Sequence, residues 1–551
     1  MNPAIGFLAM SVMWVGTTAP LLDDAGMRSL LEQRLAGDRT GACFAAAVID
    51  QTVARAVVCA DVEKPRNIDT RTAFEIGSVS KTMTAALAAG LIAEGKLALD
   101  DPLSKYMPEG TKIPEYKGQP IRIRHLMTHT SGLPALPSRL AMTMTNLEDP
   151  YAALTAKQLY GSLADVVLST APGTTFSYSN FAMMLLSDIV ARQSGKPFDK
   201  LIAEQLFVPL EMHNSFVGKT PKATRLAVGH LQTGEKTSAW NFPANYAGVG
   251  GVRASLDDMV HYVEAQLGKR HSTLDAAIAA TQEQLADVQG SRVAMNWMLM
   301  DSAGGTVHAH EGGTGGFSSL VAFDRKKGRG VVVLSDTALT AVGGLGRLGM
   351  HLLDGSVPLE SPRRAVPADA ELLAGLIGDF VLEGGLQMKL SREQDALVIQ
   401  AAGQQAYTMG FDSAGDFYPL QFDALLRPKR LSDGTYSFTW FQSGAAMAAR
   451  RSESAARPMA KDPLVLSDEQ RAAYPGDYPL MPGFVLAVIV DAGKLFVQGT
   501  GQSRIEVEAV DKDVFVAESV GAQIVFERDD TGKVIALVLH QGGQKLRGLR
   551  Q

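Results

Sequence analysis

Hydrophobic and polar residues alternate with two different periods along the chain. Between about residues 24 and 358, apolar residues recur every three or four positions in SKTMTAALAAGLIAEGK, FAMMLLSDIVARQ and SLDDMVHYVEAQLG, which predicts amphipathic helices. Strand-like apolar runs flank them, GACFAAAVI and VARAVVCA at the start and SSLVAFDRKKGRGVVVLSD at the end. Strands at both ends with helices between them predict an α+β domain whose first and last strands share one sheet.

Beyond a linker rich in proline and charge at 359–370, short alternating runs with Gly, Asp and Ser turns continue to the C-terminus. This pattern predicts antiparallel β barrels. Five matches in this region recur at a constant offset of 98 residues, as from position 378 to position 476. They are Gly378-Asp379-Phe380 with Gly476-Asp477-Tyr478, Leu397-Val398-Ile399-Gln400 with Leu495-Phe496-Val497-Gln498, Gly403-Gln404 with Gly501-Gln502, Phe417 with Phe515, and Gly434 with Gly532.

The constant offset predicts two homologous β modules, over 371–451 and 467–551, joined by a linker at 452–466. We expect them to act as a scaffold or a lid. Two barrels that bind a ligand of their own are the alternative.

The N-terminal segment and the two cysteines each permit two interpretations. The apolar stretch NPAIGFLAMSVMWVGTTA within residues 1–23 is short for a membrane span, which needs about 20 apolar residues. It fits a secretory signal or a first helix packed on the core. Cys43 and Cys59 are symmetric about Gln51, so a hairpin with a three-residue loop would place them opposite each other. They are two small buried residues or, if the protein is exported, a disulfide.

Composition limits the classes of partner. Apolar residues make up 46% of the 551 positions and charged residues 20%, the balance of a soluble globular protein with about three domains. The net charge is −6, with both signs interspersed, which argues against nucleic acid and anionic membranes as partners. We predict a periplasmic or secreted protein without a stable membrane span, with the cytoplasm as the alternative location. The oligomeric state stays open.

Two short motifs bring together groups that can carry out nucleophilic catalysis. Ser78 and Lys81 share a helix face at the head of the first helical stretch, so the amine would lie beside the hydroxyl. A lysine whose pKa burial lowers to about 7–8 can take the proton of a serine nucleophile. In Tyr178-Ser179-Asn180, the phenol can shuttle a proton and the amide can hold a substrate carbonyl. Taken alone, these motifs also fit a surface helix turn and a tyrosine beside a helix N-cap.

A third motif is the glycine-rich segment HEGGTGG at 310–316, which begins with His310. Glycines such as Gly312 and Gly313 let the backbone approach a ligand closely, so a strand here can present N–H groups to a substrate and an oxyanion. A glycine-rich turn with an incidental histidine is the alternative.

The sequence gives no sign of a cofactor site. The pairs His125 with His129 and His308 with His310 have spacings found in metal sites, but no third ligand motif accompanies either pair. Walker-type and Rossmann glycine loops are absent from the sequence. We therefore predict neither a metal nor another cofactor.

In order and spacing, these motifs resemble those of the serine β-lactamase and penicillin-binding-protein-like family, especially its class C, esterase and D-aminopeptidase branches. Stretches such as FEIGSVSKTMTA, IRHLMTHTSGLP and GVGGVRASLDDM are similar too, and the resemblance spans about residues 24–358. The β modules look like the lipocalin-like barrels that follow this domain in some members. The resemblance implies an α+β β-lactamase/transpeptidase-like domain followed by two antiparallel lipocalin-like barrels.

The resemblance also implies a role for each motif residue. Ser78 is the nucleophile that forms an acyl-enzyme, and Lys81 is its general base. Tyr178 assists proton transfer to and from the leaving group, while Asn180 positions Lys81 and the substrate. The backbone N–H groups of Ser78 and Gly313 form the oxyanion hole.

His310 takes the place of the lysine in the third motif of β-lactamases. An ordinary histidine is mostly neutral at pH 7 and attracts a carboxylate less than lysine does, which predicts weak β-lactamase activity at most. The predicted substrates are small or linear peptides, including bonds next to D-residues as in linearised microcystin. A carboxylesterase for short acyl esters and a non-catalytic binding protein derived from the fold are the alternatives.

Overall fold

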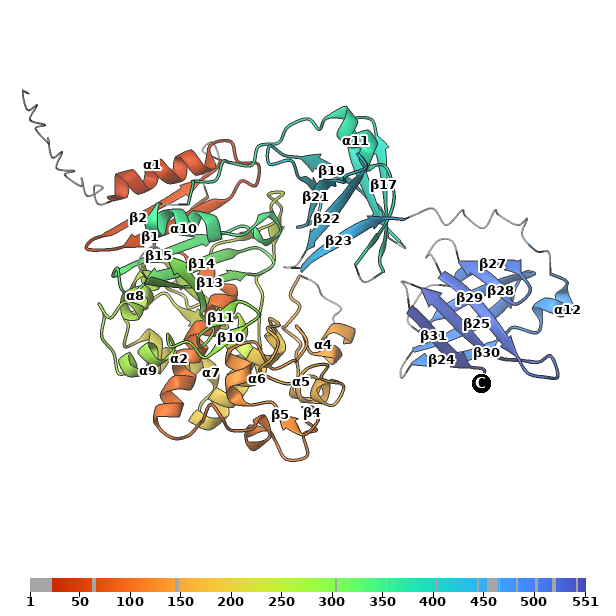
Figure 1. Cartoon of the computed structure of the whole chain (residues 1–551), viewed down its shortest axis with the longest axis horizontal. Helices are drawn as coiled ribbons and strands as arrows, with labels where there is room; N and C mark the ends of the chain where they lie inside the picture. Colours follow the sequence, from red (N-terminus) through yellow and green to blue (C-terminus); the bar gives the residue numbers. More distant parts are fainter. Residues whose placement is uncertain are drawn as a thin grey trace, which may run out of the picture.

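The computed structural model describes residues 22–61, 66–143, 148–302, 305–355, 357–383, 385–402, 404–442, 445–452, 464, 466–481, 484–500, 504–517, 522–541 and 544–551. They form a domain of helices and strands followed by two eight-stranded antiparallel units (Figure 1). Residues 1–21 lie outside the described part, so neither interpretation of the N-terminal segment is tested. None of the described helices is both long and apolar enough to cross a bilayer.

An antiparallel sheet of eight strands forms the centre of the first domain, in the order β10-β11-β12-β13-β14-β15-β1-β2. β1 (Cys43–Ile49) pairs with β2 (Val53–Cys59) and with β15 (Arg329–Ser335), which confirms that the two ends of the domain share one sheet. The other strands are β10 (Ala286–Val288), β11 (Ser291–Val293), β12 (Met298–Ser302), β13 (Gly305–Gly313) and β14 (Ser318–Asp324).

Both faces of this sheet are covered. α1 (Asp24–Leu35) and α10 (Gly346–Asp354) pack on one face against residues such as Val48, and α8 (Leu256–Gln266) packs on the other against residues such as Ala47 (Figure 1). All seven residues of β1 are therefore buried, which explains its unbroken apolar run CFAAAVI where a half-exposed strand would alternate.

The long predicted helices are present. They are α2 (Ser80–Ala93), α6 (Asn180–Ser194) and α8. α2 and α6 are buried over most of their length, since they form the core of the helical side of the domain. The shorter helices are α3 (Ile123–Met127), α4 (Ser138–Thr143), α5 (Ala156–Leu163), α7 (Phe198–Ile202) and α9 (Asp275–Ala280).

Three small sheets complete the domain. β3 (Ala73–Glu75), β9 (Val252–Ser255) and β6 (Phe216–Val217) form one of them and lead into α2. The other two pair β4 (Glu115–Tyr116) with β5 (Gln119–Pro120), and β7 (Gly229–His230) with β8 (Lys236–Thr237).

The first C-terminal unit follows α11 (Ala370–Leu376) and is a closed barrel. Its strands are β16 (Gly378–Leu382), β17 (Gln387–Glu393), β18 (Ala396–Ala401), β19 (Ala406–Phe411), β20 (Phe417–Pro419), β21 (Leu425–Arg430), β22 (Tyr436–Gln442) and β23 (Ala445–Arg451).

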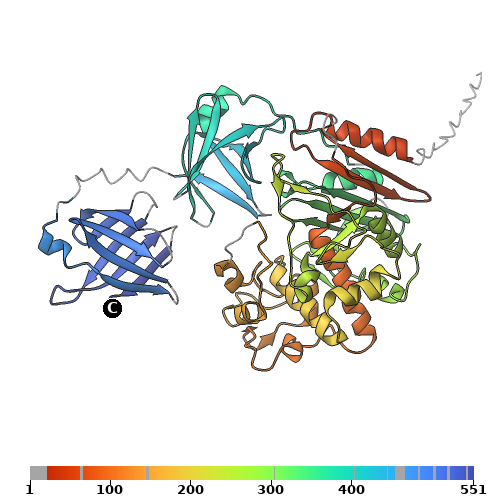
Figure 2. The same ribbon diagram turned by 180° about the vertical axis from the view of Figure 1, so that it is seen from behind.

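The second unit follows α12 (Asp468–Arg471), and Figure 2 shows the three units from behind. Its eight strands pair in chain order, and Gln551 N donates to Asp477 O at 2.9 Å, which joins the end of the chain to β24. The strands are β24 (Gly476–Met481), β25 (Phe484–Asp491), β26 (Lys494–Gly499), β27 (Ile505–Asp511), β28 (Val514–Ala517), β29 (Ala522–Arg528), β30 (Val534–Gln541) and β31 (Gln544–Leu549).

The repeat predicted from the 98-residue offset is a structural repeat. Gly378 and Gly476 open β16 and β24 with φ of 146° and 156°, values that favour glycine. Phe417 and Phe515 are both buried, in β20 and β28. Both barrel interiors are occupied by buried apolar side chains. The matched positions 403 and 501 lie outside the described residues.

The cysteine pair is a disulfide in the structure. Cys43 and Cys59 are directly opposite in the β1–β2 register, as the hairpin predicted, and their Sγ atoms are bonded. The bridge ties the edge strand β2 to its neighbour β1.

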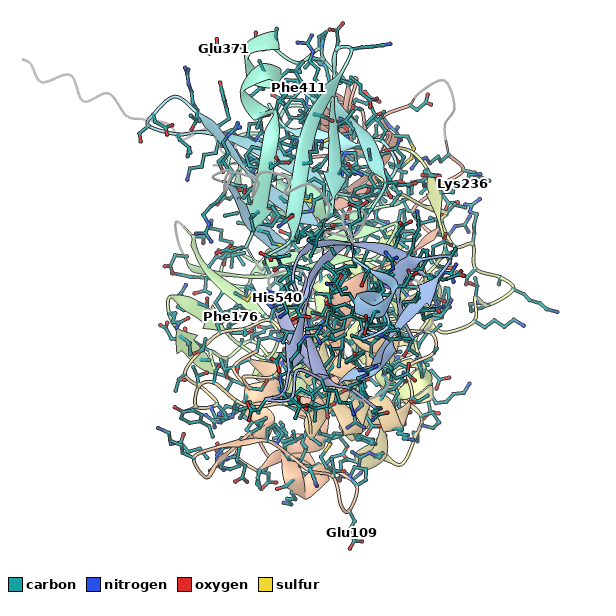
Figure 3. The ribbon with its side chains drawn as sticks, turned by 90° about the vertical axis from the view of Figure 1, so that its right-hand side faces the viewer. Glu109, Phe176, Lys236, Glu371, Phe411 and His540 are labelled. Atoms are coloured by element: carbon teal, nitrogen blue, oxygen red, sulfur yellow. A yellow bond between two sulfur atoms is a disulfide. The ribbon has the colours of Figure 1, made fainter. Side chains whose placement is uncertain are left out.

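The first barrel is joined to the first domain by a buried ionic network. Asp412, fully buried, accepts from Arg39 Nη2 at 2.9 Å and from Arg363 Nη1 at 3.0 Å. Gln232 Nε2 donates to Asp423 Oδ1 at 2.7 Å across the same contact. Figure 3 shows Glu371 of α11 at one end of the molecule and Glu109 of the first domain at the other.

Candidate active site

Ser78 and Lys81 lie together at the start of α2. Ser78 is the middle residue of a single 3₁₀ turn, Gly77–Val79, that runs directly into the helix. The i, i+3 spacing places the two side chains on one face, and Lys81 Nζ donates to Ser78 Oγ at 2.7 Å. The structure therefore confirms the predicted placement of the amine beside the hydroxyl.

Lys81 is completely buried, and burial lowers the pKa of its ammonium well below the ordinary value of 10.5. Nζ also donates to Val249 O at 2.7 Å. This carbonyl holds the amine, a role that the sequence assigned to Asn180. The amide of Asn180 interacts with the Tyr151 side chain and lowers the pKa of that phenol, while its predicted contact with Lys81 stays a prediction. A backbone carbonyl leaves no signal in a sequence, which is why Val249 was missed.

Tyr178 brings a phenol to the same point. The residue is 38% exposed as a whole, but its hydroxyl lies buried beside Ser78, which lowers the pKa of the phenol slightly. Burial raises the pKa of the phenol strongly, against a smaller lowering by Ser78, so the group is protonated at neutral pH. Lys81 Nζ lies 5.0 Å from the centre of the Tyr178 ring. The following residue, Ser179, also caps α6, its Oγ accepting from Ala182 N at 3.0 Å.

His310 on β13 faces this group, with its ring centre 6.4 Å from that of Tyr178. Its Nδ1–H donates to Glu311 O at 2.7 Å, which leaves the lone pair on Nε2. Burial, followed by the charge of Lys81, lowers the pKa of the imidazole to about 3. His310 is therefore neutral at pH 7 and differs in charge from a lysine at this position.

The glycine segment lies against the nucleophile turn. A Cβ added to Gly312 would lie 2.1 Å from Ile76 O and 3.0 Å from Ser78 N, and one added to Gly77 would lie 2.7 Å from Gly313 N. Only residues without side chains permit this approach, because real Cβ atoms keep larger distances. The structure thus brings Gly312 and Gly313 to Ser78, where their backbone was predicted to serve a substrate.

A buried ion pair that the sequence did not reveal supports the turn from β3. Glu75, three residues before Ser78, accepts from Arg253 Nη2 at 3.0 Å and from Trp240 N at 2.9 Å. Burial raises the pKa of Glu75, while Arg253 opposes that shift. The pair links the nucleophile turn to β9 and to the loop before it.

The paired histidines have other partners. Nδ1 of His125 accepts from Arg122 N at 3.1 Å, and His308 Nε2 donates to Gln282 O at 2.9 Å. Within the described part of the chain, no three His, Cys, Asp or Glu side chains are grouped so that they could hold a metal ion.

Comparison with known proteins places this arrangement in a family. The β-lactamase family model matches residues 27–348. The D-alanyl-D-alanine-carboxypeptidase/endopeptidase AmpH of Escherichia coli is 32% identical over 282 residues, covering 48% of this chain and 71% of its own length. A β-lactamase of Pseudomonas fluorescens is 30% identical over 313 residues, covering 50% of this chain and 83% of its own.

Among solved structures, a β-lactamase/D-alanine carboxypeptidase from Yersinia pestis in complex with citrate is 26% identical with a TM-score of 0.47, covering 56% of this chain and 92% of its own. The family match spans more than half of the sequence and contains all three motifs. The chain therefore belongs to the β-lactamase and penicillin-binding-protein-like family of serine hydrolases.

Proposed function

We propose that Ser78 attacks the carbonyl carbon of an amide or ester and forms an acyl-enzyme that water then hydrolyses. The observation that carries this proposal is the 2.7 Å contact between Lys81 Nζ and Ser78 Oγ, made by an amine whose burial favours its neutral form. A neutral amine takes the hydroxyl proton as the Ser78 oxygen bonds to the carbonyl carbon.

Tyr178 then gives its proton to the leaving nitrogen or oxygen as that bond breaks, and Lys81 returns the proton to the phenol. In the second step, the same groups take a proton from water and restore Ser78. The N–H groups of Ser78 and Gly313 stabilise the oxyanion, each such donor being worth about 3 kcal/mol in comparable sites. Asn180 is proposed to hold the substrate carbonyl.

The substrate we propose is a small or linear peptide, including bonds beside D-residues as in linearised microcystin. Support comes from the relative named as a D-alanyl-D-alanine-carboxypeptidase/endopeptidase. Neutral His310 gives a substrate carboxylate no permanent cation at the third motif, so we expect weak β-lactamase activity and preference for bonds not followed by a free carboxylate.

A carboxylesterase is the second candidate, because an ester needs less help from an acid to expel its leaving group. A non-catalytic binding protein is the third. The buried Lys81 argues against this last candidate, because burying an amine beside Ser78 costs stability that binding alone does not require.

The test is product analysis by mass spectrometry after incubation with D-alanyl amides, linear peptides, short acyl esters and a chromogenic cephalosporin. We expect products of amide-bond hydrolysis from the wild type and none from Ser78→Ala, a substitution that removes only one oxygen. A fluorophosphonate should label wild type and leave Ser78→Ala unlabelled. Equal activity of the two proteins, or fast cephalosporin turnover, contradicts the proposal; ester products alone favour the esterase.

We further propose that the two β modules are lipocalin-like barrels that act as a scaffold. Their filled interiors support this over a ligand-binding role. We also propose that the protein is periplasmic or secreted, because the Cys43–Cys59 disulfide is typical of oxidising compartments. Fractionation of cells carrying a C-terminally tagged chain tests the location.

A further inference from the structure

One buried histidine beside the site has no part in the reaction proposed above. His129 follows α3, is 2% exposed, and has a left-handed backbone with φ of 55°. Non-glycine residues adopt this conformation at a cost of about 1–2 kcal/mol, and it persists where the surroundings determine it. Ser177 N donates to His129 O at 2.8 Å, which joins this loop to the segment before α6.

The imidazole contacts that segment at three residues. Its ring centre lies 4.3 Å from that of Tyr178 at an interplanar angle of 31°, and 6.1 Å from that of Phe176 at 83°. Nδ1 accepts from Ser179 N at 3.2 Å. These contacts fix the ring, and the ring in turn covers one face of Tyr178.

The contacts also determine the protonation of His129. Because Nδ1 accepts a hydrogen bond, the neutral ring carries its proton on Nε2, which is buried without a partner among the described residues. Burial, then the charges of Lys81 and His310, lower the pKa of His129 well below 6.5. The uncharged ring therefore packs against Tyr178 and adds no positive charge beside the amine of Lys81.

Tyr178 needs a neighbour that fixes the orientation of its ring. Its side chain is 38% exposed, and an exposed tyrosine exchanges rotamers freely unless packing holds it. The Lys81 amine lies 5.0 Å from the ring centre, and the hydroxyl must keep its place at Ser78 to deliver a proton there.

We propose that His129 is a positioning residue: its imidazole, tilted against the Tyr178 ring, holds that ring in the orientation that directs the hydroxyl to Ser78. This inference rests on the proposed role of Tyr178 as proton donor to the leaving group. The imidazole of His129 contacts the rings of Phe176 and Tyr178 and the backbone N of Ser179, so its effect on the reaction passes through Tyr178.

The test uses substitutions that separate the ring from its hydrogen bond. His129→Asn keeps an acceptor for Ser179 N–H and tolerates the left-handed backbone, but it removes the ring that packs on Tyr178. His129→Phe keeps a ring and loses the acceptor. Each is made in the wild-type chain and with Tyr178→Phe, and folding is followed by thermal unfolding.

Activity is measured on the p-nitroanilide and the p-nitrophenyl ester of the same D-alanyl group. The anilide needs a proton on its leaving nitrogen, whereas p-nitrophenolate leaves without one. We expect His129→Asn to lower kcat for the anilide about tenfold, within the range for coupled neighbours, with KM nearly unchanged and a smaller loss on the ester. His129→Phe should retain more anilide activity than His129→Asn. In the chain that already carries Tyr178→Phe, His129→Asn should have almost no further effect.

His308→Asn is the matched control, since His308 is a buried imidazole stacked on Phe323 with ring centres 4.9 Å apart. It should lower thermal stability to a similar degree while leaving the anilide-to-ester ratio unchanged. Equal losses on anilide and ester, or an equal loss in the Tyr178→Phe background, overturn the inference. If Tyr178→Phe alone has full anilide activity, the proposed role of Tyr178 fails instead.

Discussion

At the scale of single residues, burial rather than pairing sets the electrostatics of the site. Three basic side chains, Lys81, His129 and His310, lie close together, and burial is the largest cause of the lowered pKa of each. The charge of Lys81 lowers the pKa of both imidazoles further. Both imidazoles are therefore neutral beside Lys81. Because Lys81 is buried, its ammonium loses a proton more easily than it would in water.

This arrangement fixes the sign of the pH dependence. The reaction needs neutral Lys81, so kcat/KM on an ester should be low at acid pH and rise through one limb with an apparent pKa well below 10.5. His310, with a pKa of about 3, stays neutral across this range and adds no limb near 6.5. Measurement of kcat/KM on the ester from pH 4 to 10 checks both points.

Lys81→Arg should lower kcat by about 10²–10⁴-fold, because a guanidinium keeps its proton and cannot serve as a base. Lys105→Arg is the control, since Lys105 is exposed and paired with Asp101 on the surface. Retention of wild-type activity by Lys81→Arg would mean that another group takes the serine proton.

The residues that the sequence identified and those it missed differ in kind. Ser78, Lys81, Tyr178 and His310 carry reactive side chains in recognisable spacings, so their convergence could be predicted. Val249 acts through its carbonyl, and Asn180 has its partner in a loop without a motif. In the sequence, His129 stands out only as half of a possible metal pair, because the contact of its ring with Tyr178 requires a fold that brings positions 129 and 178 together.

At the scale of elements, the approach of β13 to the 3₁₀ turn forms the site. Gly312→Ala should separate them, since the added Cβ would meet Ile76 O at 2.1 Å and backbone atoms there have little freedom to move. We expect a loss of about 10²-fold or more in kcat, because a shift of about 1 Å at reacting groups costs that much.

Gly305→Ala is the matched control at the other end of β13, where the nearest atom to an added Cβ is Asp324 Oδ1 at 3.3 Å. It should leave kcat within about twofold, as surface substitutions away from special features usually do. Thermal unfolding of both variants separates loss of the site from loss of the fold. A fully active Gly312→Ala protein would show that the strand does not need this close contact.

Elements were predicted well where local pattern determines them. The β1–β2 hairpin, the β14–β15 pair, α2, α6 and α8 each follow from periodicity and turn residues. The two barrels followed from the repeat, since equal spacing of Gly378 and Gly476 implies equal structure. The order of strands in the large sheet depends on contacts between distant segments, and periodicity contains no such information beyond the pairing of its two ends.

At the scale of the whole molecule, the contact between the first domain and the first barrel was invisible in the sequence. Arg39 and Asp412 are 373 positions apart and read as ordinary surface charges. In the structure, the Arg39 guanidinium also lies 3.3 Å from the centre of the Tyr418 ring, and Asp416 pairs with Arg363. A buried charge that loses its partner destabilises the fold. The network therefore makes the stability of each unit depend on the other.

Asp412→Ala tests that dependence. The substitution leaves Arg39 and Arg363 without their shared carboxylate, and breaking a buried pair costs about 3–5 kcal/mol. We expect the first barrel to separate from the domain at a lower temperature, seen as an early calorimetric transition and as faster proteolysis in the 359–370 linker. Asp395→Ala, which removes an exposed pair with Arg392 in the same barrel, should change neither. Because the partners of Asp412 are Arg39 and Arg363, neither of them a motif residue, ester hydrolysis below the early transition should stay near wild type if the barrel is only a scaffold. A parallel loss of activity would show instead that the docked barrel helps to form the substrate site.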